Sequence, residues 1–311
     1  MKDIATIKRI RALAIPPAWS DVWICPKANG HIQATGRDDR RRKQYRYHSS
    51  WAASRDETKF GRILVFAKIL PKLRTTVQRH MRQKKLTREK VLATLVFLLE
   101  NTLIRVGNAE YARTNNSYGL TTLKDRHVSF CATGAKFRFC GKTGKEWRVD
   151  VHDRRIARIV KGCHDLPGQH LFQYEDDAGE PHPITSSDVN DYLRAFGDEA
   201  ISAKDFRTWA GTVLAAVALA EVDAANFEAA AKQNIRQAIK RVAISLGNSP
   251  TICRKCYIHP EILCGYLEGD IVSCLADGNV VRRPLGLSVP EAATLALLQR
   301  RQRPRQRRGQ R

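Results

Sequence analysis

Residues 127–151, HVSFCATGAKFRFCGKTGKEWRVDV, contain the pattern that decides the fold class. Runs of β-branched and aromatic residues alternate there with turn residues, which predicts three strands at 128–130, 136–139 and 147–149. A Gly-Lys-Thr-Gly turn joins the last two strands, so Lys142 would lie at the tip of a hairpin. We therefore expect a three-stranded sheet in the middle of the chain.

Helical periodicity flanks this sheet on both sides. Toward the N-terminus, apolar residues recur on one face from about Phe60 until Pro71, which is expected to break the helix. Thr87 is suited to cap a second helix, which should end near Gly107. Toward the C-terminus, the pattern predicts three more helices, at 187–196, 202–222 and 227–246.

Capping residues mark the ends of two of these helices. Ser202, with Asp205 three residues later, resembles a capping box in which Asp replaces the usual Glu. Gly247 is suited to cap the end of the 227–246 helix. The 204–211 segment, KDFRTWAG, would then begin a helix, where the dipole favours anions.

Residues 19–51 are rich in β-formers and turn residues. Asn29-Gly30 lies between two β-forming runs and is a strong hairpin signal, and 43–48 predict a further strand. The opening residues offer little for a complete sheet, so this domain looks short at its N-terminus.

The fold class that follows is α+β, with a small N-terminal antiparallel β domain and a larger, mainly α catalytic domain that holds the three-stranded sheet. The boundaries we predict are 1–55 for the β domain, 56–290 for the catalytic domain and 291–311 for a basic tail. The linker should lie near 54–59. The final RRQRPRQRRGQR has no apolar face, so we expect it to be disordered and to add phosphate contacts.

Charge limits the choice of partner. The 311 residues include 54 Lys and Arg against 31 Asp and Glu, a formal net charge of +23. Such a surplus repels itself unless an acidic partner compensates it, and nucleic acid is the first candidate. A membrane is less suitable because no apolar run reaches the roughly 18 residues of a span. The charged start lacks the apolar core of a signal peptide, which predicts a cytoplasmic protein. With DNA as its acidic partner, the protein would be nucleoid-associated.

No cofactor or metal is expected. The eight cysteines are scattered, and Cys253-Arg-Lys-Cys256 lacks the second ligand pair of a zinc site. The Gly-Lys-Thr-Gly turn is not an ATP-binding loop, because Lys136 stands where that loop needs its first glycine.

Four segments together suit transfer at a phosphodiester. This chemistry needs a nucleophile, positive donors around the phosphoryl oxygens and a proton for the leaving oxygen. The segments are 103–112 with Arg105, the hairpin with Lys142, KDFRT at 204–208, and 247–260 with CRKCYIHP at its end. Each has an ordinary explanation when taken alone: a helix-end arginine, a turn lysine, a surface cation, a packed tyrosine.

In this order the four segments resemble the type IB DNA topoisomerases, specifically the short poxvirus and bacterial branch. The β segment matches too, as GHIQATGRD at 30–38 and RRKQYRYH at 41–48, where Arg41 replaces the leading Gly of the family. Matching runs extend from Pro16 to about Pro260. The resemblance implies a tyrosine recombinase/topoisomerase IB catalytic fold and a duplex DNA substrate.

The resemblance also implies roles for six catalytic residues. Tyr257 would be the nucleophile that forms a 3′-phosphotyrosyl bond, and Arg105 and Arg207 would clamp the non-bridging oxygens. Lys142 would protonate the leaving 5′-oxygen, with assistance from Lys204. Asn248 stands where the viral enzymes have His, so it would donate a hydrogen bond through its amide but carry no charge.

The β segment is expected to contact DNA. The resemblance places Gln44, Tyr45 and Tyr47 against bases and phosphates, and Arg42 and Lys43 extend that basic surface. Tyr111, in the Arg105 segment, is a further predicted contact. Tyr45 and Tyr47 are two apart and share one strand face, which could alternatively face the core of the β domain.

The activity implied is relaxation of supercoiled DNA by a monomer that closes as a clamp around the duplex, without ATP or metal. Two alternatives stay open from the sequence. A tyrosine recombinase or integrase shares the catalytic plan, although such enzymes usually have HxxR where this chain has Lys204-Asp-Phe-Arg207. A non-catalytic basic DNA-binding protein is the other.

Overall fold

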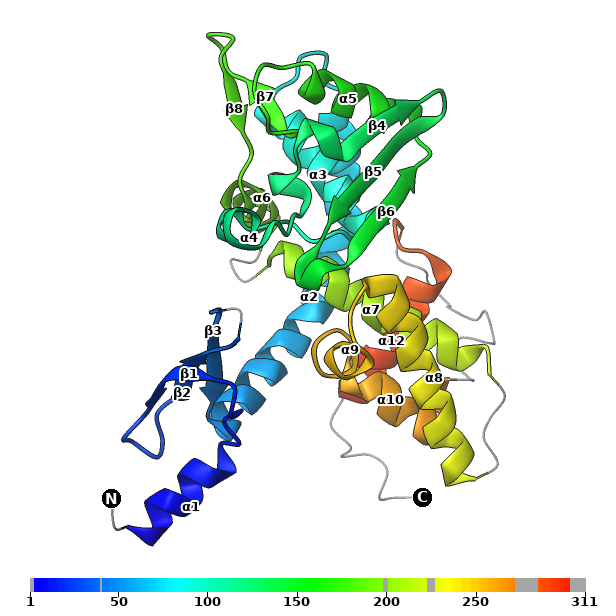
Figure 1. Ribbon diagram of the computed structural model, residues 1–311. Helices are drawn as coiled ribbons and strands as arrows, with labels where there is room; N and C mark the ends of the chain where they lie inside the picture. Colours follow the sequence, from blue (N-terminus) through cyan, green and yellow to red (C-terminus); the bar gives the residue numbers. More distant parts are fainter. Residues whose placement is uncertain (1–2, 40, 198–200, 223–226, 272–284, 303–311) are drawn as a thin grey trace. The chain divides into compact units, whose positions relative to one another are not determined.

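The computed structural model describes residues 3–39, 41–197, 201–222, 227–271 and 285–302 (Figure 1). Contacts group the chain into two compact units, residues 1–61 and 62–311. None of the described helices is both long and apolar enough to cross a membrane.

The N-terminal unit contains a helix and a three-stranded antiparallel sheet. The sheet has the order β1-β2-β3, with β1 at Ser20–Ile24, β2 at Ile32–Arg37 and β3 at Lys43–Tyr47. The predicted strands and the Asn29-Gly30 hairpin are therefore confirmed. Helix α1 (Ile4–Ala12) was missed, although Asp3 caps it by accepting from the backbone N–H groups of Ala5 and Thr6. An acidic cap before an apolar residue is the signal that could have identified it.

Helix α2 (Ser49–Met81) corrects two expectations. Residues 54–59, predicted as a linker, are helical, and Pro71 does not end the helix. A proline inside a helix costs about 3 kcal/mol. Leu70 and Leu73 are each 1% exposed on either side of it, so burial of this apolar face offsets that cost.

Helix α3 (Arg88–Thr102) begins as predicted, because the Thr87 hydroxyl accepts from the Lys90 N–H. It ends before the predicted Gly107, since Leu103 adopts the left-handed conformation with φ 56°. A non-helical stretch then leads to α4 (Ala109–Asn115). Arg105 is therefore on a loop rather than on the last turn of the helix.

The central sheet is confirmed. Its antiparallel order is β4-β5-β6, with β4 at Val128–Cys131, β5 at Gly134–Cys140 and β6 at Glu146–Val151. The last β5–β6 pair is Cys140 with Glu146, and the 3-10 turn η3 (Lys142–Gly144) closes the hairpin. Buried Phe137 and Phe139 anchor β5 in the core. Helix α5 (Arg154–His164) and the pair β7 (Gln173–Glu175) and β8 (Pro181–Pro183) follow.

The three predicted C-terminal helices are confirmed as α6 (Ser186–Arg194), α7 (Ala203–Ala220) and α8 (Glu228–Leu246). Ser202 and Asp205 form the expected capping box, and Gly247 caps α8 with φ 61°. Two short helices that were not predicted follow, α9 (Pro250–Cys256) and α10 (Pro260–Leu267).

The start of the predicted tail is a correction. Residues 291–302 belong to helix α12 (Val289–Gln302), in which Leu295, Leu297 and Leu298 are at most 5% exposed. These leucines form a buried apolar face, which the highly charged composition of the predicted tail did not indicate. Residues 303–311 lie outside the described part of the chain.

Candidate active site

Five of the six predicted catalytic residues line one pocket of about 450 Å³ in the C-terminal unit. They come from a loop, a hairpin, a helix start and a helix end, and are separated by up to 152 positions in the sequence (257 − 105). The five are Arg105, Lys142, Lys204, Arg207 and Tyr257, and the predicted DNA contact Tyr111 lines the same pocket. Folding thus gathers a phenol and four cations around one space.

Arg207 is held by the ends of two helices. Its Nη1 donates to the carbonyl oxygen of Leu103, directly after α3, and its Nη2 donates to the carbonyl oxygen of Leu246, at the end of α8, over 2.6 Å. The C-terminal end of a helix carries partial negative charge, so both contacts favour a guanidinium. This arrangement compensates for the placement of Arg207 near the positive start of α7.

The guanidinium of Arg207 is buried beside the phenol ring of Tyr257. It is 3% exposed and lies 5.1 Å from the centroid of the Tyr257 ring. Burial and the nearby charge of Arg105 lower the pKa of Arg207, and Tyr257 opposes them. Its Nε is buried without a hydrogen-bond partner among the described residues. An anion between Arg105 and Arg207 would reduce the repulsion between the two guanidinium groups and could accept from the Nε of Arg207.

Asn248 orients Arg105 rather than lining the pocket. The Oδ1 of Asn248 accepts from Arg105 Nη2 over 2.6 Å, and its Nδ2 donates to the Leu246 carbonyl oxygen over 3.3 Å. That same carbonyl oxygen also accepts from Arg207. The amide therefore links the two arginines, and its donor group points to the backbone instead of to the pocket.

The lysines reach the pocket from its exposed side. Lys142, on the β5–β6 hairpin, has its Nζ 6.0 Å from the centroid of the Tyr111 ring. Lys204 is exposed in the first turn of α7, so the helix dipole adds to its attraction for phosphate.

Tyr257 is fixed through its backbone. It caps the end of α9, and its carbonyl oxygen accepts from the Thr212 hydroxyl over 3.3 Å. Helix α7 passes very close, because a Cβ at Gly211 would lie only 2.6 Å from the Tyr257 carbonyl oxygen. The glycine at 211 lets α7 and the tyrosine approach each other.

We expect Gly211→Ala to displace Tyr257 and to slow adduct formation with DNA about 100-fold, the typical cost of misplacing a reacting group by about 1 Å. The measurement is the rate at which protein becomes covalently attached to labelled DNA. The control is Gly162→Ala in α5, where the new methyl would meet only Leu86 at 3.9 Å. Equal rates for both variants and the unmodified chain would show that this contact does not position the tyrosine.

Trp147 was missed by the sequence reasoning and joins two parts of the site. A Cβ at Gly141, beside Lys142, would lie 2.6 Å from Cδ1 of Trp147, and one at Gly247, beside Asn248, would lie 2.8 Å from Cζ2. The indole also stacks on Phe139, with centroids 6.3 Å apart and planes at 7°. One ring thus sets the distance between the hairpin and the α8–α9 turn. No local pattern in the sequence marks Trp147, because Gly247 lies 100 positions away from it.

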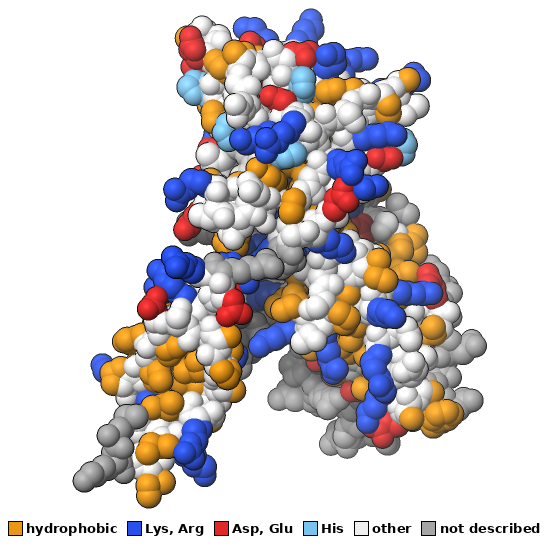
Figure 2. Space-filling view, viewed as in Figure 1, with side chains coloured by type: hydrophobic (Ala, Val, Ile, Leu, Met, Phe, Trp, Pro, Cys, Tyr) orange, Lys and Arg blue, Asp and Glu red, His pale blue; other side chains and the backbone are white. Residues whose placement is uncertain are grey.

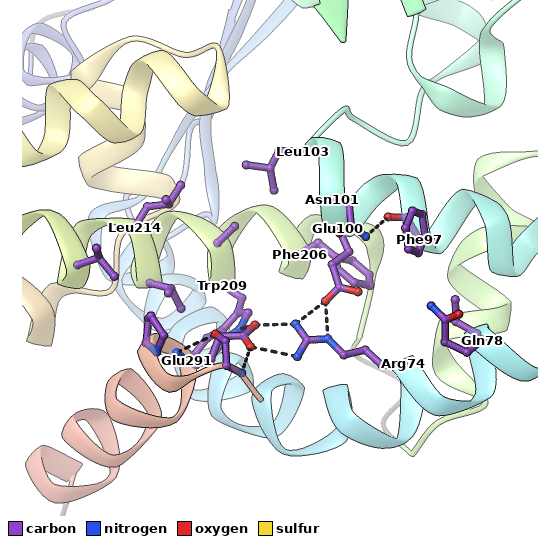
Figure 3. Close-up of a pocket in the computed structure, with 16 residues that line it drawn as sticks. Arg74, Gln78, Phe97, Glu100, Asn101, Leu103, Phe206, Trp209, Leu214 and Glu291 are labelled. Carbon is purple, nitrogen blue, oxygen red and sulfur yellow. Dashed lines mark hydrogen bonds and ion pairs between the residues drawn. The ribbon is translucent and has the colours of Figure 1, made fainter. Parts of the chain in front are cut away.

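A larger cavity of about 700 Å³ in the same unit contains none of the predicted site residues (Figure 3). Its charged groups satisfy one another: Arg74 pairs with Glu100 over 2.6 Å and with Glu291 over 2.7 Å, and Trp209 Nε1 donates to Glu291. The polar groups of this cavity are therefore paired with one another, and the rest of its wall is mostly apolar.

The predicted DNA contacts of the N-terminal unit divide into two groups. Tyr45 and Tyr47 are 42% and 38% exposed, so they do not form a core face, and Lys43 is exposed on the same strand face. Hydrophobic side chains gather over this sheet in the space-filling view (Figure 2). Gln44 and Arg42 instead hold Asp38, at 2.9 and 2.7 Å.

Among the described residues, no three His, Cys, Asp or Glu side chains are grouped as a metal site. The seven described cysteines are free thiols, with Cys253 buried and Cys256 half-buried, and Cys274 lies outside the described ranges. Arginine and lysine side chains supply the positive charge of the pocket.

Comparison with known proteins gives two family matches. Residues 48–266 match the family described as "Eukaryotic DNA topoisomerase I, catalytic core", and residues 1–38 match "Bacterial DNA topoisomerase IB, N-terminal domain". The chain is 30% identical over 259 residues to DNA topoisomerase 1B of Acanthamoeba polyphaga mimivirus, which covers 81% of this chain and 77% of that protein. It is 25% identical over 235 residues to the Monkeypox virus DNA topoisomerase I and the Vaccinia virus (strain Copenhagen) DNA topoisomerase 1B, covering 73% of this chain and 70% of each.

Fold, pocket and matches together define an enzyme of the DNA topoisomerase class, an isomerase that acts on duplex DNA. The chain belongs to the type IB DNA topoisomerase family, as the resemblance to the poxvirus and bacterial branch implied. The matches give no support to a recombinase or to a non-catalytic DNA-binding protein.

Proposed function

We propose that the 450 Å³ pocket is the active site and that Tyr257 is its nucleophile. The phenol oxygen of Tyr257 forms a bond to a backbone phosphorus while the bond from phosphorus to the 5′-oxygen breaks. The protein is then joined to the 3′-phosphate, and the free 5′-end rotates and releases supercoils. The 5′-hydroxyl attacks the phosphotyrosyl bond to reseal the strand, which requires no ATP because the linkage retains its energy.

Arg105 and Arg207 stabilise the transition state in this proposal. Both guanidinium groups line the pocket that contains the phenol, and a planar guanidinium suits bidentate pairing with phosphoryl oxygens. Each such donor typically contributes about 2.7–4 kcal/mol to the rate. The concentrated positive charge also favours the phenolate form of the nucleophile. Asn248 acts through Arg105, by holding its Nη2.

Lys142 supplies the proton that the 5′-oxygen takes as it leaves, and Lys204 assists. A lysine ammonium on an exposed hairpin tip has the reach and the proton for this role, and general-acid catalysis typically contributes 10²–10⁴-fold. Tyr111, whose ring is 6.0 Å from Lys142 Nζ, lies where DNA entering the pocket would contact it.

Trp147 should act as a positioning residue for Lys142. We expect Trp147→Ala to slow cleavage about 100-fold, since the hairpin loses the ring against which Gly141 packs. Trp147→Phe, which keeps an aromatic ring, should recover most of the rate. The measurement is single-turnover cleavage of a DNA oligonucleotide with one cleavage site.

A second DNA substrate, with sulfur in place of the 5′-bridging oxygen, tests whether Trp147 acts on protonation of the leaving group. A thiolate leaves without a proton, so it makes a general acid unnecessary. Trp147→Ala should cleave this DNA nearly as fast as the unmodified chain does. An equal loss of rate with both DNA substrates would mean that Trp147 supports the fold and does not position Lys142.

The experiment that tests the function is relaxation of a supercoiled plasmid that lacks any recombination site, in EDTA and without ATP. The proposal predicts relaxation to completion by the purified chain. Strand exchange between specific sites without relaxation would instead identify a recombinase, and binding without either reaction would identify a non-catalytic protein.

We further propose that the chain acts as a monomer, with its two units closing around the duplex, in the cytoplasm and on the nucleoid. The net charge of +23 and the basic, aromatic sheet face of the N-terminal unit support a large phosphate-contacting surface. Sedimentation of the chain on short duplex DNA should therefore give a complex with one copy of the protein.

A further inference from the structure

The exposed face of the N-terminal sheet carries a cross-strand row of three residues. Trp23 on β1 pairs with Thr35 on β2, and Thr35 pairs with Tyr45 on β3. Trp23 is 50% and Tyr45 is 42% exposed, whereas Ala34, on the opposite face of β2, is fully buried. Two large rings therefore stand in solvent on either side of a small residue.

The spacing of this row suits one planar ring. Neighbouring strands lie about 4.8 Å apart, so β1 and β3 are roughly 10 Å apart, and side chains stand almost perpendicular to a sheet. A ring held between two others needs about 7 Å, because carbon atoms in contact are about 3.5 Å apart. A cavity of about 460 Å³ lies here, and its walls include Trp23, Thr35 and Tyr45.

One wall of this slot is braced by further aromatic side chains. Tyr45 stacks on Tyr47 at 5.9 Å and 12°, and Tyr47 stacks on Trp51 at 4.6 Å and 23°. The cation of Lys43, which also lines the cavity, lies 5.8 Å from the Tyr45 centroid. The cavity is thus bordered by aromatic rings and by a positive charge, the two features of sites that stack nucleobases.

We propose that the slot between Trp23 and Tyr45 binds a single unpaired nucleobase of DNA, a proposal that rests on DNA being the substrate of this chain. In a paired duplex each base is covered on both faces by its neighbours, so only an unpaired base offers two faces to two rings. The chain should therefore bind DNA with a bulged base, or a single strand, in addition to intact duplex.

The test uses the full chain with Tyr257→Phe, so that no cleavage occurs. The probes are a duplex with one bulged 2-aminopurine, the same duplex with that base paired, and a single strand that contains it. Stacking quenches 2-aminopurine. We expect quenching and roughly 5- to 150-fold tighter binding of the bulged duplex than of the paired one, the range for stacking of one base.

Two variants and a control separate the slot from general DNA binding. Trp23→Ala removes one wall of the slot and Thr35→Leu fills the space between the two walls, and each should abolish the preference for the bulged duplex over the paired one. Val22→Ala changes a neighbour that is 41% exposed and does not line the cavity, and it should keep the preference. If fluorescence is quenched only in the single-strand probe, the slot takes its base from a melted strand. This result also supports the proposal.

Equal binding of bulged and paired DNA, without quenching of any probe, would overturn the proposal. Full quenching of the bulged probe by the Trp23→Ala variant would overturn it as well. Relaxation by the chain with its native Tyr257 is measured in parallel. Relaxation without a slot preference rejects this inference alone, whereas a slot preference without relaxation rejects the proposed function and leaves a DNA-binding site.

Discussion

The Tyr257→Phe variant is expected to form no covalent adduct with DNA and to relax no plasmid, while its affinity for duplex DNA changes by less than about twofold. The phenol oxygen is the only atom removed, and the ring that faces Arg207 at 5.1 Å remains. Loss of an enzyme's nucleophile can lower the rate by about 10⁶-fold. Denaturing gels of protein with labelled DNA measure the adduct, and titration of the same DNA measures affinity.

Tyr111→Phe is the matched control, because Tyr111 lines the same pocket and is 39% exposed. It should still form the adduct. Adduct formation by Tyr257→Phe at the rate of the unmodified chain would move the nucleophile to another residue.

The Arg207→Ala variant is expected to lose both rate and stability. Cleavage should slow at least 100- to 1,000-fold, the effect of removing one transition-state donor worth about 2.7–4 kcal/mol. The free energy of unfolding should also fall by about 1–3 kcal/mol, because the carbonyl oxygens of Leu103 and Leu246 lose a buried donor. Single-turnover cleavage and urea denaturation measure the two effects.

Variants of two other arginines separate the loss of cleavage rate from the loss of stability. Arg105 is half-buried, and its guanidinium holds a side chain, that of Asn248, rather than buried backbone carbonyl oxygens, so Arg105→Ala should lose rate with little change in stability. Arg74 is tied to Glu100 and Glu291 outside the pocket, so Arg74→Ala should lose stability and keep its rate once folded. Unimpaired cleavage by folded Arg207→Ala would contradict the assigned role.

Local signals in the sequence were sufficient for much of the fold. The alternation in 128–151 and the glycines around Lys142 predicted the central sheet and its hairpin, and Asn29-Gly30 predicted the N-terminal hairpin. The capping box at Ser202 predicted where α7 begins and therefore where Arg207 lies. These features depend on residues a few positions apart, which is why one sequence reveals them.

Long-range packing decided what the sequence did not reveal. Pro71 stays helical because Leu70 and Leu73 are buried, and the charged segment 291–302 is helical because its leucines enter the core. The loop position of Arg105 follows from the left-handed conformation of Leu103, whose carbonyl oxygen binds Arg207, 104 positions away. No local pattern encodes such a contact.

The candidate site likewise has a part that the sequence predicted and a part that it did not. The identities of Tyr257, Arg105, Arg207 and Lys142 came from the family resemblance, but the arrangement of their supports did not. Asn248 was expected to donate to phosphate, whereas its Oδ1 accepts from Arg105 and its Nδ2 faces a carbonyl oxygen. Trp147 contacts the surroundings of two catalytic residues without carrying chemistry itself, so no motif identifies it.

The central claim is that the Tyr257 phenol attacks a backbone phosphorus in a pocket whose positive charge comes from side chains. The direct measurement is to denature the protein during reaction with 5′-labelled duplex DNA in EDTA, digest it and sequence the peptide that carries the label. The account predicts one labelled peptide, with Tyr257 joined to the 3′-phosphate. A label on another residue, an adduct without the 5′-label (which would mean linkage to the 5′-end), or an adduct that forms only with added Mg²⁺ would contradict it.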